Sequence, residues 1–283
     1  MAASHPDYPM WSALLRWSLT QTDGTDEARA PPKAMSAEDR EFLAKVMKEC
    51  TVDHAQRIGA CLEAVAAWTA GAPGGPDAAA CVAALEEIEY FIEDLDFARD
   101  LCKLGGMKVV LDALAKAGGG DVARAAAVVV AAAAQNDPPV QACVAKLKGL
   151  GSLVAAWRGD AATRRTTLAA ISAVVRGNGP VEDAFAASGA AAEVVAAALG
   201  AVAAGDGSSD ALRVAAKAAF LLDALACDAG PDRLAALAPA FAAAADAAAR
   251  VPASSDADDE SAAAARLQLH EFLASAAKRA PPP

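Results

Sequence analysis

Apolar residues recur every three or four positions through most of the chain, which is the spacing of one face of an α-helix. Near the start, Trp11, Leu14, Leu15 and Leu19 follow this spacing and predict one short amphipathic helix. The polar stretch 20–35, which contains a glycine and a Pro-Pro pair, predicts a linker after it.

A second apolar stripe follows Ser36, which precedes Asp39 by three positions, as in an N-terminal capping box. The stripe continues to Trp68 and ends at the run GAPGGP at 71–76, because glycine and proline disfavour helix. Asp77 is then placed to cap the next helix. We therefore predict a helical connector over 36–76.

The predicted helix after Asp77 has an apolar face from Val82 to Leu95, and its other faces are acidic, with Glu86, Glu87, Glu89, Glu93 and Asp94. Two close carboxylates can perform general acid–base chemistry. No histidine or lysine is nearby in the sequence to assist them, so we interpret these residues as a solvated helix face.

Beyond residue 100 the sequence repeats itself. Gly106, Gly149 and Gly189 each begin a short apolar segment, and a longer predicted helix follows each one. These longer helices span 121–136, 163–178 and 210–228. Matching positions lie roughly 40–48 residues apart, the period of armadillo and HEAT repeats, whose units bury their apolar faces by stacking on neighbours.

The predicted fold is therefore all-α, an armadillo/HEAT-like right-handed α-solenoid with an N-terminal helical extension. We divide the chain into a front helix and flexible linker (1–35), the helical connector (36–76), an armadillo-like repeat domain (77–250), and an acidic mobile segment with a C-terminal helix (251–283). The loop GDGSSD at 205–210 accounts for the longer last interval between repeats.

Composition and charge narrow the function classes. The net charge of −11 and the lack of a dense Lys/Arg stripe argue against nucleic acid and an anionic membrane as partners. The first residues lack the pattern of a secretory signal, and no apolar run is long enough to span a bilayer, so we expect a cytoplasmic protein. We also expect it to be a monomer.

We expect no catalytic residue, metal site or cofactor. No GxSxG, phosphate-binding loop or HExxH motif occurs, and the six cysteines lack metal-ligand spacing, so we interpret them as reduced core residues. His54 and His270 are isolated on predicted helices, without a ligand set around them. Trp11 and Trp17 could engage a partner, but we favour their docking on the protein's own surface.

Four stretches carry a family resemblance. They are LLRWSLTQTDGT at 14–25, MSAEDREF at 35–42 running into TVD at 51–53, LEEI at 85–88 followed by IEDLDFARDLCKLGGM at 92–107, and the pair AQNDP at 134–138 and AISAVVRGNGP at 170–180. Together they resemble the armadillo-type nucleotide exchange factors of heat-shock-70 chaperones, the Hsp-binding-protein family, in its plant-like cytosolic form. The resemblance covers roughly residues 11–245. Where that family usually has a basic or polar residue after Arg176, this chain has Gly177.

The resemblance implies a co-chaperone that clamps one lobe of a heat-shock-70 ATPase domain with its concave face, lined by the third helices of the repeats, and so promotes ADP release. Arg176 matches the family's repeat-end motif. Helix position alone adds the other candidates for partner contact, which lie on or at the ends of the predicted third helices. The whole candidate set is Arg124, Asn136, Arg165, Arg176, Asn178 and Lys217. Each cation could instead point into solvent or pair locally.

An armadillo-type adaptor or scaffold that binds a protein without exchange activity is the alternative. Peptide-carrying nuclear-import receptors repeat a tryptophan and an asparagine along successive third helices. Asn136 and Asn178 are present here, but no tryptophan lies in a predicted third helix, which argues against that type of adaptor. The alternative that the sequence leaves open is a protein that binds the chaperone without accelerating ADP release.

Overall fold

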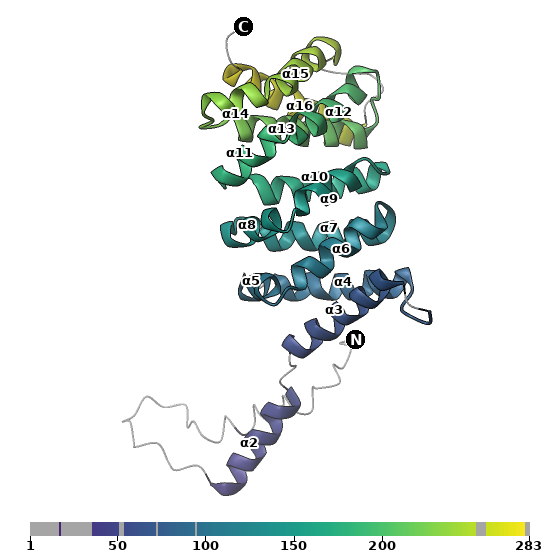
Figure 1. The fold of residues 1–283 in the computed structure, drawn as a ribbon, viewed down its shortest axis with the longest axis vertical. Coiled ribbons are helices and arrows are strands. Elements are labelled where there is room, and N and C mark those ends of the chain that lie inside the picture. The colour runs from purple at the N-terminus through teal and green to yellow at the C-terminus, as the bar shows by residue number, and fades with distance from the viewer. Residues whose placement is uncertain are drawn as a thin grey trace, which may run out of the picture. The chain divides into compact units, whose positions relative to one another are not determined.

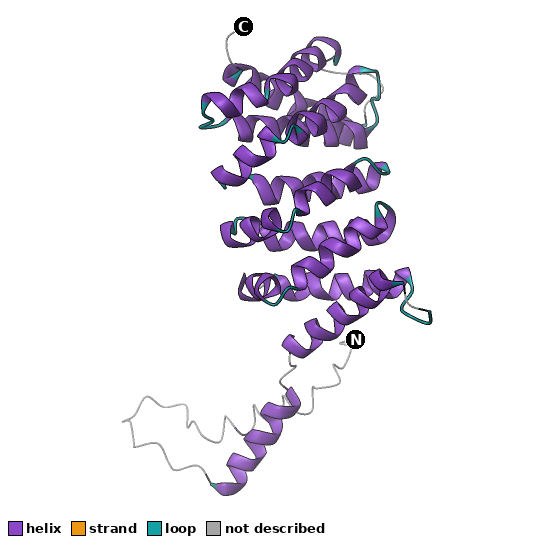
Figure 2. Cartoon of the chain, viewed as in Figure 1, coloured by secondary structure: helices purple, strands orange, loops and turns teal. Residues whose placement is uncertain are grey.

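The computed structural model describes residue 17 and residues 36–50, 54–71, 73–93, 95–252 and 259–280. Every regular element in these ranges is a helix (Figure 2), which confirms the predicted all-α class. The chain separates into two compact units, Met1–Arg57 and Ile58–Pro283, and each is described by itself.

The first unit contains α2 (Ala37–Cys50), and its start is the predicted capping box. The Ser36 hydroxyl accepts a hydrogen bond from the Asp39 backbone N–H at 3.0 Å and donates one to Asp39 Oδ2 at 2.7 Å. Asp39 Oδ1 also accepts a bond of 2.9 Å from the Trp17 indole N–H, so Trp17 contacts its own chain. Trp11 and the rest of the predicted front helix lie outside the described residues.

The helices of the second unit fall into three positional classes that repeat along the chain (Figure 1). The first helices are α5 (Leu95–Lys103), α8 (Pro138–Lys146), α11 (Gly179–Ala187) and α14 (Pro231–Ala236). The second helices are α3 (His54–Ala70), α6 (Gly106–Ala117), α9 (Gly149–Trp157), α12 (Ala190–Ala203) and α15 (Ala238–Arg250). The third helices are α4 (Ala78–Ile92), α7 (Gly120–Ala134), α10 (Ala161–Val175), α13 (Ser209–Ala226) and α16 (Glu260–Arg279).

Each class packs against its own kind in the next repeat. The third helices form the sequence of contacts α4–α7–α10–α13–α16, the second helices α6–α9–α12–α15, and the first helices α5–α8–α11–α14. This nearest-neighbour order is that of an α-solenoid, as predicted. The stack reaches beyond the expected range 77–250, because α16 packs along α13 as the third helix of a further repeat.

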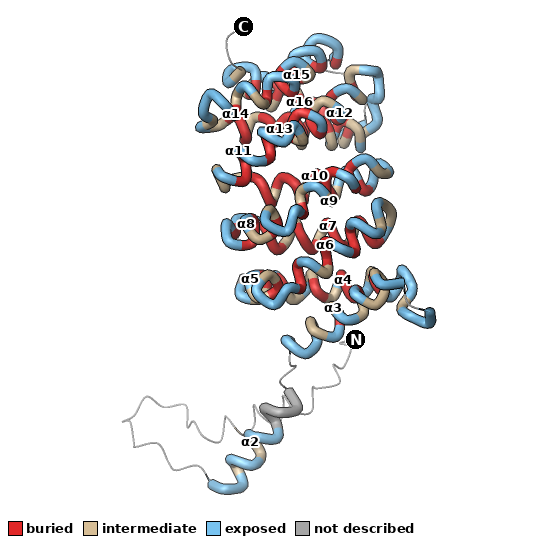
Figure 3. Tube along the Cα trace, in the orientation of Figure 1, coloured by how far each residue is buried: buried red, intermediate tan, exposed pale blue. Residues whose placement is uncertain are grey.

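The core of the stack runs between the layers (Figure 3) and is rich in alanine. In α7 the buried residues are Val122, Val129 and Val130 together with five alanines. Because alanine adds little side-chain volume, the backbones of neighbouring helices can approach closely, and the larger residues between them fill the remaining space.

A close approach also explains the glycine that recurs at the start of the second helices. A Cβ on Gly149, the first residue of α9, would lie 2.7 Å from Val144 Cγ1 and 2.9 Å from Leu111 Cδ1. Gly106 holds the same position in α6 and has equally close neighbours. The third predicted glycine, Gly189, differs because it precedes α12 as a left-handed cap with a φ of +75°.

Polar contacts that involve buried side chains join the first helix α8 to neighbouring helices. Arg99 on α5 forms a 2.8 Å ion pair with Asp137, which caps α8 and is 1% exposed. Gln141 on α8 donates to the backbone oxygens of Ala173 and Arg176, at 2.9 and 3.0 Å, and so binds the end of α10. These bonds satisfy carbonyl groups that a helix leaves free at its C-terminus.

Within the described ranges, no single helix combines the length and apolarity needed to cross a bilayer. Only α11 and α12 taken together pass that test, and they are bent by 72° where they meet.

Candidate protein-binding surface

The third helices leave one stripe of side chains incompletely buried, and we call these stripes together the third-helix surface. On α10 the stripe includes Arg165 and Ala169 and continues to Arg176, the residue that follows the helix. On α13 it includes Lys217 and Phe220, among residues spaced three or four apart. This spacing places them on one face of each helix. The opposite faces of both helices are buried in the stack.

Arginines near the N-terminal ends of the third helices bind the next repeat. Arg124 on α7 lies 3.7 Å from the carboxylate of Asp160, which caps α10, and it also pairs with Asp121. Arg165 on α10 lies 3.4 Å from Asp210 on α13. The predicted contact residues Arg124 and Arg165 are therefore engaged in bonds between repeats.

Arg213 continues this series one repeat further, because its guanidinium bonds to the Ser261 hydroxyl on α16. Sequence reasoning missed Arg213, although it lies in the motif DALR that opens the third helix at 210. The recurrence of an arginine at this place in α7, α10 and α13 is the signal that could have found it.

At the other end of α10, Arg176 stacks on an aromatic side chain. Its guanidinium carbon lies 4.8 Å from the ring centre of Phe220 on α13, and the Phe220 ring lies 5.0 Å from that of Phe272 on α16. The Arg176 Nε is buried and has no hydrogen-bond partner within the described residues. Stacking, rather than a carboxylate, therefore fixes the orientation of this arginine.

Lys217 lies near enough to Arg176 to be affected by its charge. Burial, together with the Arg176 charge, lowers the pKa of Lys217. Over the described part of the chain, neither cation has a carboxylate oxygen within ion-pair distance. The two form a partly desolvated, uncompensated positive site, which an anionic group of a partner would stabilise.

The two predicted asparagines lie in the turns after third helices. Asn136 has a φ of +56° and occupies the same place after α7 that Gly177, with a φ of +77°, occupies after α10. Asn178 instead corresponds to Asp137, since each precedes a first helix as its N-cap. The Asn178 side chain donates to the backbone oxygen of Pro138 at 3.3 Å. Asn136 and Asn178 therefore hold different positions in their turns.

The third-helix surface is acidic where it begins, at α4, the third helix nearest the N-terminus. Burial, together with Glu86 and Glu93, raises the pKa of Glu89. Tyr90 on the same helix is 71% exposed. The surface thus changes from acidic at α4 to basic at Arg176 and Lys217, and this polarity would orient a partner along the stack.

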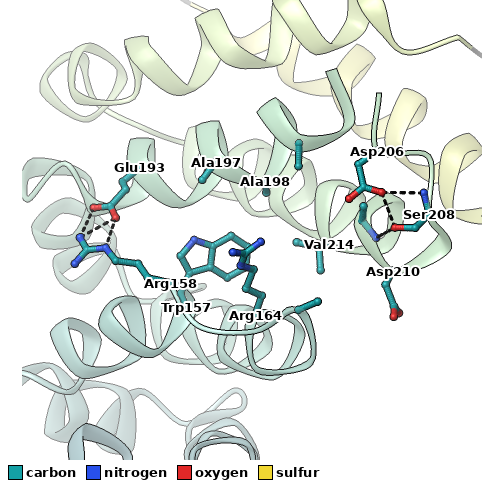
Figure 4. Close-up of a pocket in the computed structure, with 13 residues that line it drawn as sticks. Trp157, Arg158, Arg164, Glu193, Ala197, Ala198, Asp206, Ser208, Asp210 and Val214 are labelled. Atoms are coloured by element: carbon teal, nitrogen blue, oxygen red, sulfur yellow. Dashed lines mark hydrogen bonds and ion pairs between the residues drawn. The ribbon is translucent and has the colours of Figure 1, made fainter. Parts of the chain in front are cut away.

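A cavity of about 370 Å³ opens beside the N-terminal ends of α10 and α13 (Figure 4). Trp157 and Arg164 extend into it, and the Arg158–Glu193 ion pair of 2.7 Å closes one side. This pair raises the pKa of Arg158 and lowers that of Glu193. The cavity exists because α12 contributes small side chains there, such as Ala198. Sequence reasoning selected Arg165 and missed its neighbour Arg164, which lines this cavity.

The described residues contain no group of three or more His, Cys, Asp or Glu side chains that could hold a metal ion. The third-helix surface presents arginine, lysine, tyrosine and phenylalanine beside small apolar residues, which are side chains common in protein interfaces.

Residues 12–101 match the family model of the nucleotide exchange factor Fes1. The matched residues make up about a third of the 283-residue chain. The match confirms the resemblance to armadillo-type exchange factors of heat-shock-70 chaperones. The Fes1 region contains α2 to α4 and most of α5, so it runs into the first three-helix repeat of the stack. No curated protein matches the chain.

Proposed function

We propose that the chain is a nucleotide exchange factor that binds the ATPase domain of a cytosolic heat-shock-70 chaperone and promotes ADP release. The observation that carries this proposal is the Fes1 match over 12–101. The continuous stack of third helices supports it, because such a stack provides an extended surface for a folded partner. The protein acts by binding as a monomer and performs no chemistry of its own.

The mechanism follows from linkage between two binding equilibria. A protein that binds the ADP-poor conformation of the ATPase domain more tightly weakens ADP binding by the same factor. A hundredfold weakening of ADP needs about 2.7 kcal/mol of differential binding. No group on the exchange factor has to contact the nucleotide.

Arg176 and Lys217 are the contact residues that we place at the centre of the site. Both are partly buried, and neither has a carboxylate partner among the described residues, so pairing with an acidic group of the ATPase domain would offset their mutual repulsion. Arg124 and Arg165 already have partners in the stack and contribute less. Asn136 and Asn178 lie at the turns beside this surface.

Stopped-flow release of a fluorescent ADP from a purified cytosolic heat-shock-70 protein tests the proposal. We expect micromolar protein to accelerate release and the double variant Arg176→Glu, Lys217→Glu to abolish most of the acceleration. A matched control combines Arg250→Glu and Lys278→Glu, which change the same charge at exposed positions of α15 and α16.

The alternative, a scaffold without exchange activity, predicts a different result from the same materials. Calorimetry would then show binding of the ATPase domain while the rate of ADP release stays at its basal value. That outcome, or no acceleration at micromolar protein, would refute the exchange function.

A further inference from the structure

A second surface lies on the first helices, between α5 and α8. It is a groove of about 730 Å³ whose floor includes Cys102, Val140 and Cys143. We call it the first-helix groove. Val140 is fully buried, while Cys102 and Cys143 are half-buried. The groove therefore has an apolar floor that reaches the protein surface.

Exposed leucines mark the same edge of the stack. Leu104 follows α5 and is 83% exposed, and Leu147 follows α8, lines the groove and is 38% exposed. The two occupy the same corner of successive repeats, because the next residues, Gly105 and Lys148, are both left-handed caps of the following helix. Large apolar side chains at two equivalent exposed corners are typical of a contact surface.

The rim of the groove is basic in a protein with a net charge of −11. Its charged lining residues, among those the structure describes, are Arg99, Lys103, Lys108 and Lys146, and the carboxylate partners of the first three lie outside the lining. Arg99 is paired with the buried Asp137, so it is not available to a ligand. The three lysines are the cations available to a ligand.

Two of these lysines have exposed partners on their own helices. Lys103 pairs with Asp100 at 2.8 Å and Lys108 with Asp112 at 2.6 Å, and all four side chains are at least 49% exposed. Exposed pairs of this kind contribute at most about 1 kcal/mol, so exchange for a ligand carboxylate costs little. Lys146 forms no ion pair within the described residues.

We propose that the first-helix groove binds an acidic linear peptide segment of a partner protein, with a large apolar side chain on the floor and carboxylates on Lys103, Lys108 and Lys146. Charge complementarity selects this ligand: the rim is positive within an acidic protein, which would repel an acidic segment elsewhere. The groove lies on first helices and is distinct from the third-helix surface, so its ligand is a second partner or a second segment of the first.

Fluorescence anisotropy on the full chain tests this site without any chaperone present. The probe is a fluorescein-labelled peptide in which glutamate alternates with leucine. One comparison peptide has glutamine in place of glutamate, and another has alanine in place of leucine. We expect the probe to bind at low salt and both comparison peptides to bind at least about tenfold more weakly. Added salt should lower the affinity of the probe.

Variants locate the binding. Lys103→Glu with Lys146→Glu should weaken the probe at least about tenfold, while the matched pair Lys45→Glu with Lys278→Glu, on α2 and α16, should leave affinity within about twofold. Leu147→Ser should weaken the probe without changing the charge. Circular dichroism and the Tm establish that each variant is folded. If the double variant does not fold, Lys146→Glu alone replaces it in the binding measurement.

Three results would overturn the proposal. One is equal weakening by the groove pair and the control pair, which would indicate general electrostatic attraction. Another is equal binding of the glutamine peptide. The third is self-association in sedimentation that Leu147→Ser abolishes, since the groove would then hold a second copy of this chain. The ADP-release assay measures a different surface, so either proposal can fail while the other stands.

Discussion

The guanidinium carbon of Arg176, at the end of α10, lies 4.8 Å from the ring centre of Phe220 on α13. Phe220 in turn packs against Phe272 on α16, at 5.0 Å between ring centres. Three consecutive third helices are thus connected through one side-chain series. A change at any member should alter both the packing between repeats and the orientation of Arg176.

The first prediction concerns this stacking. Phe220→Leu keeps an apolar side chain but removes the ring face, so the coupling between Arg176 and residue 220 should disappear. A double-mutant cycle of Phe220→Leu and Arg176→Met, followed by urea unfolding, should give a coupling of about 0.5–1 kcal/mol. Additive effects of the two substitutions would show that the contact does not stabilise the fold.

Phe220→Leu also tests whether the orientation of Arg176, and not only its charge, contributes to binding of the ATPase domain. The substitution keeps both cations but frees Arg176 to move, so affinity for the ATPase domain should fall by a smaller factor than in Arg176→Glu. Calorimetry compares the two. Equal affinities for native protein and both variants would remove Arg176 from the binding site.

The third helices were predictable from the sequence, and the first helices were not. The repeated openings DVAR, ATRR and DALR mark long segments that form α7, α10 and α13 almost as predicted. The segment of α8 begins with Pro138, which the sequence suggests only as a helix stop, and α8 has nine residues. Helices this short gain most of their stability from tertiary packing, so local pattern alone does not reveal them.

The candidate site was predictable only as a set of cations. Arg165 and Lys217 look alike in sequence, but Arg165 has Asp210 within reach and Lys217 has another cation, Arg176. The charged groups that face Arg165 and Lys217 come from neighbouring repeats, so whether each cation has a counter-ion depends on how the repeats pack. The left-handed turn that makes Asn136 equivalent to Gly177 is likewise a property of backbone geometry.

The second prediction concerns Gly177, where the chain departs from the family it resembles. Its φ is +77°, and beyond its two chain neighbours no described residue has a heavy atom within 4 Å of a Cβ added there, so the cost of substitution comes from the backbone alone. Gly177→Ala should lower the free energy of unfolding by about 1–2 kcal/mol. Gly177→Asn should cost less, because Asn136 already adopts this conformation after α7.

Urea unfolding of both variants, with the reciprocal Asn136→Gly as a control, measures these differences. Asn136→Gly should be nearly neutral, since glycine tolerates the same φ. If Gly177→Ala were as stable as the native protein, the left-handed turn would be absent, and Gly177 could be replaced by a basic residue at no cost.

The third prediction concerns the pH dependence of stability at Asp160, the N-cap of α10. Hydrogen bonds from the Thr163 hydroxyl and backbone N–H, a third from the Gly120 N–H, and the Arg124 charge hold the pKa of Asp160 well below its usual range. Because the unfolded pKa is about 3.9, the stabilisation is complete above that pH and is lost as the pH falls through the folded-state pKa.

Asp160→Asn keeps a capping oxygen and removes the charge. The variant should be less stable than the native protein near neutral pH, and the difference should shrink below about pH 4. Urea unfolding across this range measures it, and Asp232→Asn, at an exposed position on α14, controls for the change in net charge. A difference that grows as the pH falls would contradict the assigned bonding.

The fourth prediction concerns the ion pair between Arg233 on α14 and Glu182 on α11, at 2.6 Å with both side chains at most 11% exposed. Although burial acts to lower the pKa of Arg233, its bonds to Asp183 and Glu182 raise it above its usual value. Arg233→Met leaves Glu182 buried without a cation, so the free energy of unfolding should fall by about 3–5 kcal/mol.

The exposed pair of Arg250 with Asp246 provides the matched control, because Arg250→Met should cost less than about 1 kcal/mol. Adding Glu182→Gln to Arg233→Met should restore part of the loss, since the stranded charge is removed while an amide oxygen can still accept from the Gly177 N–H. A loss below about 1 kcal/mol for Arg233→Met would mean that water reaches Glu182. The seam between α11 and α14 would then be open to solvent, and the last repeat would be held mainly by the packing of α15 on α12 and of α16 on α13.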